Sequence, residues 1–316
     1  MKKVFYVLVT TLFIATWFLL VDVKGALFLA IKGNWGLIFL ALLAGFTSSL
    51  IASLRLKFLI SIIGEIPYLE VLALGWLGGL ISLILPFYVG GFSMAYLVSK
   101  KLKISYLKSF TVLFLDFAIG VLPTLILGIF SVIYFVQKKL VSFRSQPPET
   151  LGVAFLILLL LLIFFLVFVR RFNQGEIILR LKRGAQLFSN SQKKLILALF
   201  LNLLAFFFGL LSFYLYFLAF GLFPGILDFA LAGSILGILG LVPGAFAKIG
   251  QYETFGVITL PFLLGLDKNG VFAVLLISHA ISITTTLTLG LTSLYLLNLN
   301  FSKIGALFGL KRDGQN

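Results

Sequence analysis

Long apolar runs recur along this chain of 316 residues, and they constrain its fold more than any other feature. Only 11% of the residues are charged and the mean hydropathy is +1.18, unlike a soluble domain. Six runs are long enough to cross a hydrocarbon core of about 30 Å as single helices. We therefore predict an all-α polytopic membrane protein, whose full spans are residues 4–21, 35–54, 109–136, 151–169, 195–218 and 271–297.

Two further apolar regions, 71–98 and 227–265, do not predict single helices. The first is interrupted by "LPFYVGG" (85–91) and the second by "LVPGAFAKIGQYE" (241–253). Proline removes a backbone donor and clashes with the preceding turn, and nearby glycines deepen the break. The remaining helical pieces are about 22 Å long, which is short for a crossing. We expect two re-entrant helical hairpins, with two tilted full spans as the alternative.

The distribution of Lys and Arg predicts the orientation of the chain. With the N-terminus inside, the cytoplasmic segments 1–3, 55–70, 99–108, 170–194 and 298–316 hold about three times as many Lys and Arg as the external segments. Such an excess is typical of cytoplasmic loops. It predicts a multi-pass protein of the cytoplasmic membrane with both termini inside. The net charge of +15 therefore indicates anionic lipid rather than nucleic acid.

The order of spans and hairpins predicts an inverted repeat. Residues 1–136 follow the order span, span, hairpin, span. Residues 151–297 repeat that order after an external linker, 137–150, and a cytoplasmic tail, 298–316, follows. Each half crosses the membrane an odd number of times, so the halves run in opposite senses. Paired broken helices in inverted halves are typical of transporters.

The two breaks also predict a binding site. Non-helical backbone at membrane depth needs protein or water around it, so we expect the tips to meet at a central cavity. Helix N-termini there would attract an anion, Lys248 adds positive charge, and Glu253 is expected to pair with Lys248. The alternative is a structural kink with a snorkelling lysine. The predicted headgroup cavity comprises Pro86, Gly90, Gly91, Pro243, Gly244, Lys248, Gly250 and Glu253.

Other polar residues in apolar surroundings have two interpretations each. Asp116 has either a coupling or headgroup role or a satisfied contact within the bundle. His279, the only histidine, is expected to pack through hydrogen bonds rather than to relay protons. Arg55 and Lys57 are expected to end the second span and contact lipid headgroups. Asp228 is expected to cap the helix that follows it.

Catalytic and metal chemistry have little support in the sequence. The absence of cysteine excludes disulfides, thiolate metal sites and cysteine nucleophiles. The chain has one histidine, and it has no paired intramembrane carboxylates and no DxD-type metal motif. We therefore predict no catalytic residue, no metal site and no cofactor.

The two break motifs, in this order and spacing, resemble the lysylphosphatidylglycerol synthase transmembrane-region family, the flippase-like membrane part of the multiple peptide resistance factor. The resemblance covers roughly residues 1–300 and includes the proline, the glycines and Glu253 of the motifs. Relatives often have an acidic residue and an arginine where this chain has "FSMAY", and an arginine where it has Phe114 and Leu115. The family's synthase activity resides in a separate soluble domain, so the resemblance implies the translocase-like part alone.

These observations favour a flippase or transporter that moves an anionic lipid or lipid-linked headgroup between leaflets. The alternatives are an integral-membrane transferase for glycosyl or phospholipid headgroups, and a non-catalytic membrane partner of such an enzyme. The expected partners are membrane lipids, with a separate soluble synthase or glycosyltransferase as a further candidate. The chain has no P-loop, so transport would be gradient-driven, ion-coupled or passive.

Overall fold

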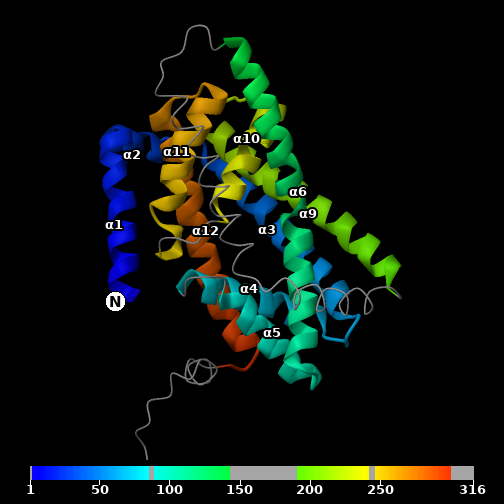
Figure 1. The fold of residues 1–316 in the computed structure, drawn as a ribbon. Helices are drawn as coiled ribbons and strands as arrows, with labels where there is room; N and C mark the ends of the chain where they lie inside the picture. Colours follow the sequence, from blue (N-terminus) through cyan, green and yellow to red (C-terminus); the bar gives the residue numbers. More distant parts are fainter. Residues whose placement is uncertain (1, 85–88, 143–190, 242–245, 300–316) are drawn as a thin grey trace, which may run out of the picture.

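The computed structural model describes residues 2–84, 89–142, 191–241 and 246–299, and these residues form helices and connecting loops (Figure 1). The elements are α1 (Lys2–Leu20), α2 (Val23–Ile31), α3 (Trp35–Ile60), α4 (Tyr68–Ile84), α5 (Val89–Leu102), α6 (Tyr106–Ser142), α9 (Gln192–Ala219), α10 (Ile226–Leu239), the 3-10 turn η2 (Phe246–Lys248), α11 (Gln251–Leu264) and α12 (Lys268–Leu296).

Four described helices are long and apolar enough to cross a membrane: α3, α6, α9 and α12. A fifth candidate is the pair formed by the end of α1 and by α2. The prediction of a multi-pass helical membrane protein is therefore confirmed. The predicted span 151–169 lies outside the described residues.

The segment 22–34, which the sequence predicts as a connecting segment, contains helix α2. This helix bends by 91° from Phe13–Leu20 of α1. Its start is joined to the beginning of α12, because the backbone N–H of Asp22 donates to Asn269 Oδ1 at 2.9 Å. The exposed apolar side chains of α2, such as Phe28 and Ile31, are suited to a lipid surface.

Both interrupted regions form helix pairs. Helix α4 packs against α5, and α10 packs against α11, while the connecting residues 85–88 and 242–245 lie outside the described residues. Gly90 makes the first pair close, because a Cβ at this position would lie 1.9 Å from the Gly78 carbonyl oxygen. Figure 1 shows the two pairs at opposite ends of the long helices.

Helices from the two halves of the chain interlock. Helix α3 packs along α9, α4 against α12, and α10 against α6. Two serines join α3 and α9 in both directions: Ser48 donates to the Ala205 carbonyl and Ser212 to the Ala41 carbonyl, each at 2.7 Å. Ser131 of α6 likewise donates to Leu231 of α10 at 2.8 Å. Such hydroxyl bonds and small residues are typical of contacts between membrane helices.

Segments that the charge pattern assigns to one side of the membrane lie together. At one end, the Asn34 N–H donates to the Ala219 carbonyl at 2.8 Å. At the other end, Lys194 Nζ donates to the Ser61 carbonyl at 2.8 Å. The two sets of loops therefore gather at separate ends of the bundle, and which end faces the cytoplasm stays a prediction.

Two expectations about helix ends are wrong. Helix α3 continues to Ile60, so Arg55 lies within it and not in the loop after it. Asp228 lies in the first turn of α10, whose N-cap is Gly225. Asp228 does not cap α10, because its carboxylate accepts hydrogen bonds from Tyr134 at 2.7 Å and Lys138 at 2.6 Å on α6.

Candidate functional site

The second break motif folds around Glu253, in the first turn of α11. The Gly250 N–H donates to Glu253 Oε2 at 2.9 Å, which satisfies one of the donors that a helix start leaves open. Gly250 has φ +82°, and a Cβ there would lie 2.7 Å from Cβ of Phe13 on α1. Only glycine fits this combination of positive φ and close approach.

His279 of α12 joins the motif from the other side. Its Nδ1 lies 2.6 Å from Glu253 Oε1, and its Nε2 lies 3.1 Å from the Ala247 carbonyl oxygen. The side chains of His279 and Glu253 are 12% and 3% exposed, so this is a buried pair. His279 therefore bridges α11 and the η2 turn through hydrogen bonds, and its partner Glu253 was not predicted.

The expected pairing of Lys248 with Glu253 is wrong. Lys248 Nζ donates instead to the Gly240 carbonyl at the end of α10, at 2.7 Å. Ala247 and Lys248 both have positive φ, 48° and 57°. This turn directs the Lys248 side chain to α10, while Glu253 faces its own helix start and α12.

The remaining residues of the predicted headgroup cavity are distributed as follows. Gly90 is buried against α4, and Gly91 has open space in front of it. Pro86, Pro243 and Gly244 lie outside the described residues. A cavity between the tips therefore stays a prediction.

A second buried network lies among α3, α6 and α9. Arg55 makes a bidentate ion pair with Asp116, with Nε to Oδ1 at 2.7 Å and Nη2 to Oδ2 at 3.0 Å. Arg55 Nη1 also donates to Asn202 Oδ1, and Asn202 Nδ2 donates to the Ile119 carbonyl at 2.6 Å. The expectation that Arg55 contacts lipid headgroups at the end of its span is therefore wrong. The helix extends past it, and Asp116 holds its charge inside the bundle.

Part of the Arg55 guanidinium stays available to a ligand. A guanidinium has five N–H donors, and three are used in this network. Gly120 leaves room beside it, since a Cβ at this position would lie 3.4 and 3.5 Å from the two Nη atoms. The group therefore combines a structural ion pair with free donors.

These donors face a cavity of about 430 Å³ that lies among α3, α6, α9 and α10. Small residues form much of its wall, and the aromatic rings of Phe206 and Phe213 form another part. The volume is within the range of about 300–1,000 Å³ typical of small-molecule sites. The lining residues are Ser48, Ala52, Arg55, Gly120, Thr124, Asn202, Ala205, Phe206, Gly209, Leu210, Phe213, Gly233, Ser234 and Gly237.

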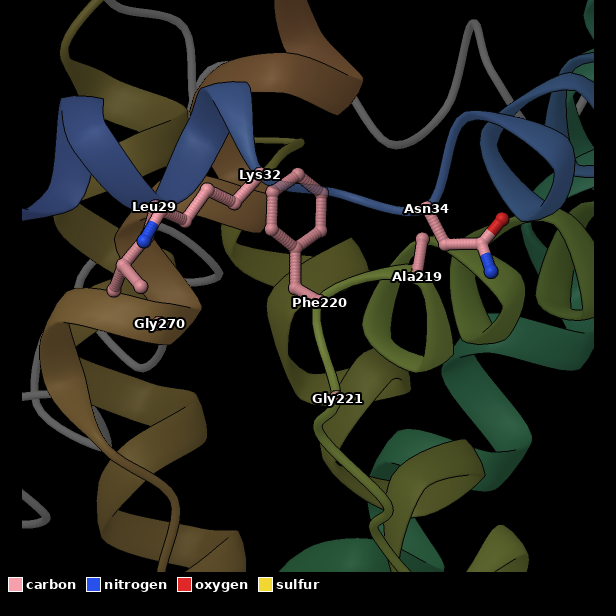
Figure 2. Close-up of a pocket in the computed structure, with 7 residues that line it drawn as sticks. All are labelled: Leu29, Lys32, Asn34, Ala219, Phe220, Gly221 and Gly270. Carbon is pink, nitrogen blue, oxygen red and sulfur yellow. The ribbon is translucent and has the colours of Figure 1, made fainter.

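Another cavity, of about 460 Å³, lies at the end of the bundle where the predicted external segments meet. Figure 2 shows that its side chains come from the end of α2, the start of α3 and the turn after α9. Its cation, Lys32, lies over the Phe28 ring at 4.0 Å from the centroid.

Sequence reasoning missed Arg55 and Asn202 as members of one site. A signal existed in Asn202, a polar residue within the apolar run "LFLNLLAFF". Polar residues inside membrane helices usually face a partner or a cavity. Arg55 gave no such signal, because a basic residue near the end of a span is typical of any membrane helix.

Comparison with known families identifies the family of this chain. A family model described as the lysylphosphatidylglycerol synthase TM region matches residues 4–290. The chain belongs to this family. The match spans all of the described helices except the first two residues of α1 and the C-terminal end of α12. No curated protein and no solved structure matches the chain.

Membership of the lysylphosphatidylglycerol synthase TM region family confirms the resemblance seen in the two break motifs. It is consistent with a membrane function related to lipids. Both candidate sites, the buried Arg55 network and the Glu253–His279 pair, lie within the matched residues.

Proposed function

We propose that this protein is a flippase-like transporter that moves an anionic lipid or lipid-linked headgroup between the two leaflets. The observation that carries the proposal is the cavity beside Arg55, because a guanidinium with free donors inside a membrane bundle can hold a phosphate. A charged residue at membrane depth is costly, and such residues usually mark a substrate or ion pathway.

The depth of the network supports a headgroup site rather than a surface contact. Asp116 and Asn202 each lie seven residues inside the predicted spans 109–136 and 195–218, which corresponds to about 10 Å along the axis. Half of a hydrocarbon core is about 15 Å thick. A headgroup that reaches Arg55 would therefore have entered the hydrocarbon region.

The way in which the halves interlock supports an inverted repeat. Helix α4 of the first half packs on α12 of the second, and α10 of the second packs on α6 of the first. The serine bonds between α3 and α9 are also reciprocal, because each helix donates one hydroxyl to a carbonyl of the other. In such transporters one repeat rocks against the other around a central site. We propose the same motion here, with both hairpins re-entrant and both termini cytoplasmic.

The tip motifs remain part of this proposal. Lys248 and the N-terminus of α11 would form a second polar position for the headgroup, with Pro86, Gly90, Gly91, Pro243, Gly244 and Gly250 shaping the tips. The proposed partners are anionic or lipid-linked membrane lipids. A soluble synthase or glycosyltransferase that makes such a lipid would be a natural additional partner.

The test is lipid translocation in liposomes that contain the purified protein. A fluorescent lipid with an anionic headgroup is placed in both leaflets, and bleaching of the outer leaflet by a reductant measures exchange. We expect the wild type to accelerate exchange, and Gly233→Leu to abolish the acceleration because its side chain fills the cavity. Gly225→Leu is the matched control on the same helix, where a Cβ meets nothing within 4 Å.

The outcomes separate the proposal from its alternatives. Loss of exchange in Gly233→Leu, with retention in Gly225→Leu and equal folding of both, supports transport through this cavity. No acceleration by the wild type with any anionic lipid tested, at any membrane potential or pH gradient, contradicts it. Equal exchange by both variants would also contradict it.

A further inference from the structure

The contacts of His279 determine how many protons the pair with Glu253 carries. The Ala247 carbonyl oxygen can only accept a hydrogen bond, so His279 Nε2, 3.1 Å away, must carry a hydrogen. Nδ1 and Glu253 Oε1, 2.6 Å apart, also need one hydrogen between them. That hydrogen belongs either to an imidazolium facing a carboxylate or to a carboxylic acid facing a neutral imidazole. In both arrangements the pair holds one proton more than a neutral histidine and an ionised glutamate.

We propose that the Glu253–His279 pair is a proton-binding site of this protein, and that release of its proton frees the η2 turn. When the proton leaves to water, an ionised carboxylate and a neutral imidazole with one ring hydrogen remain. That hydrogen stays on Nδ1, where it donates to Glu253, and Nε2 presents a lone pair to the Ala247 carbonyl oxygen. Two acceptors repel each other, so the bond from His279 to Ala247 is lost.

The η2 turn is built to respond to that loss. Ala247 and Lys248 are non-glycine residues with positive φ, 48° and 57°. Such backbone is strained and persists only while surrounding contacts hold it. The hydrogen bonds that hold it from outside are the bond from His279 to Ala247 and the bond from Lys248 to the Gly240 carbonyl. Removing the first leaves the bond to α10 and the packing against α1 and α4 to hold the turn.

The surroundings place no other carboxylate against the pair among the described residues. The titratable neighbours are Tyr252, whose ring lies 5.0 Å from the His279 ring, Tyr216 on α9, and Lys248 at the turn. Helix α1 contributes the hydroxyl of Thr16, which shares a hydrogen bond with Thr254.

Charges on the other helices nearby are engaged elsewhere. Glu70 of α4 pairs with Lys101, and Asp228 of α10 pairs with Lys138. On α2, Lys24 lies near the helix start, where Asp22 bonds Asn269 of α12. Asn269 precedes His279 by about 15 Å of helix. Gain or loss of the proton on the pair therefore changes the charge of this region of the bundle by one.

A proton site at this position goes beyond the proposed lipid transport, because it identifies the ion that could drive the change between two states. The sequence has no nucleotide-binding loop, and a proton gradient needs none. Binding of a proton would favour the closed η2 turn, and release would favour an open one.

The experiment uses the fact that His279 is the only histidine of the chain. The protein is labelled with ¹⁵N-histidine, purified through a tag without histidine, and placed in lipid nanodiscs. The two ring nitrogen signals then report the protonation and hydrogen bonding of one residue. We expect Nε2 to lose its hydrogen as the pH is raised through the range in which the protein stays folded, while Nδ1 keeps its hydrogen bond to Glu253.

The decisive variant is Glu253→Gln. Its amide can donate to Nδ1 and accept from the Gly250 N–H, so it reproduces the protonated pair without a removable proton. We expect its Nε2 to keep its hydrogen as the pH is raised, because Nδ1 then accepts from the amide and Nε2 still donates to Ala247. The matched control is Asp267→Asn, since Asp267 also accepts a backbone N–H, from Gly270 at 2.7 Å, and lies beside α12.

A second readout follows the turn itself. The chain has no cysteine, so a spin label at Ile249→Cys occupies one position only. We expect its collisions with a water-soluble relaxation agent to increase as the pair loses its proton, and to stay low in Glu253→Gln. A pair that holds or lacks its proton throughout the range overturns the proposal, as does equal titration in wild type and Glu253→Gln. Neither readout uses a lipid substrate, so failure here is distinct from failure of lipid transport.

Discussion

At the scale of single residues, the Arg55–Asp116 pair shows how a charge is retained inside an apolar bundle. The guanidinium is held by two carboxylate oxygens and by Asn202, which in turn is fixed by the Ile119 carbonyl. Each charge offsets the cost of burying the other only while both are present. Sequence alone could not pair them, because 61 residues separate Arg55 from Asp116.

The first prediction concerns this pair. Arg55→Met leaves the Asp116 carboxylate buried without its partner, so we expect a loss of about 3–5 kcal/mol in the free energy of unfolding. The double variant Arg55→Met/Asp116→Leu removes both charges and should recover most of that loss. Unfolding in detergent or lipid, followed by circular dichroism, measures both variants, with Lys57→Met as control on the same helix. Equal losses in the single and double variants would contradict the pairing.

The second prediction concerns Gly250. An alanine there combines φ +82° with a Cβ 2.7 Å from Cβ of Phe13, so both strain and a clash oppose it. We expect Gly250→Ala to cost about 1–3 kcal/mol of stability. Gly225→Ala has open space around it and should change stability by no more than about 0.5 kcal/mol. Thermal unfolding in nanodiscs compares the two, and a neutral Gly250→Ala would show that α1 is not packed on this turn.

At the scale of elements, the two helix interruptions could be predicted because proline and glycine act on the backbone close to their own positions. The interrupted region 227–265 agrees with the pair α10 and α11 within one residue at each end, and helices lie on both sides of each break. Helix α2 was not predicted, because an apolar segment of 9 residues is too short to cross the membrane and lies in a predicted connecting segment. The end of α3 was placed too early, because a buried ion pair allows a helix to continue through a charge.

The third prediction tests a helix start. The side chain of Asp267 accepts from the Gly270 N–H at 2.7 Å and caps α12. Asp267→Ala removes this acceptor and should cost about 0.5–2 kcal/mol, whereas Asp267→Asn keeps it and should cost much less. Hydrogen exchange of the first turn of α12 locates the effect. Equal exchange in the two variants would indicate that the cap has no energetic role.

At the scale of the whole molecule, the distribution of Lys and Arg and the order of spans and hairpins predicted which segments lie together. The loops expected on one side do lie at one end, and the helix pairs lie at opposite ends (Figure 1). The predicted span 151–169 lies outside the described residues, so the exact number of crossings stays a prediction. The cavity beside Arg55 could not be predicted, because it needs four helices from both halves to meet.

The fourth prediction concerns orientation. Single cysteines placed at 101–107 should react with a membrane-impermeant maleimide only after the cells are opened, because these residues are predicted to be cytoplasmic. Cysteines at 221–223 should react in intact cells. The chain contains no cysteine that would interfere. The reverse pattern would invert the topology, and reaction at both sites in intact cells would contradict the segregation of the two ends.

The most direct test of the central claim is retention of lipid by purified protein, measured by native mass spectrometry with equal amounts of phosphatidylglycerol and phosphatidylcholine. The wild type should prefer the anionic lipid. In Arg55→Gln/Asp116→Asn the net charge is unchanged while the guanidinium is lost, so the preference should fall about tenfold or more, as expected for a hydrogen bond to a charged group. The control Lys57→Gln/Glu65→Gln makes the same charge change outside the cavity and should keep the preference. Equal preference in both double variants and the wild type would contradict a headgroup site at Arg55.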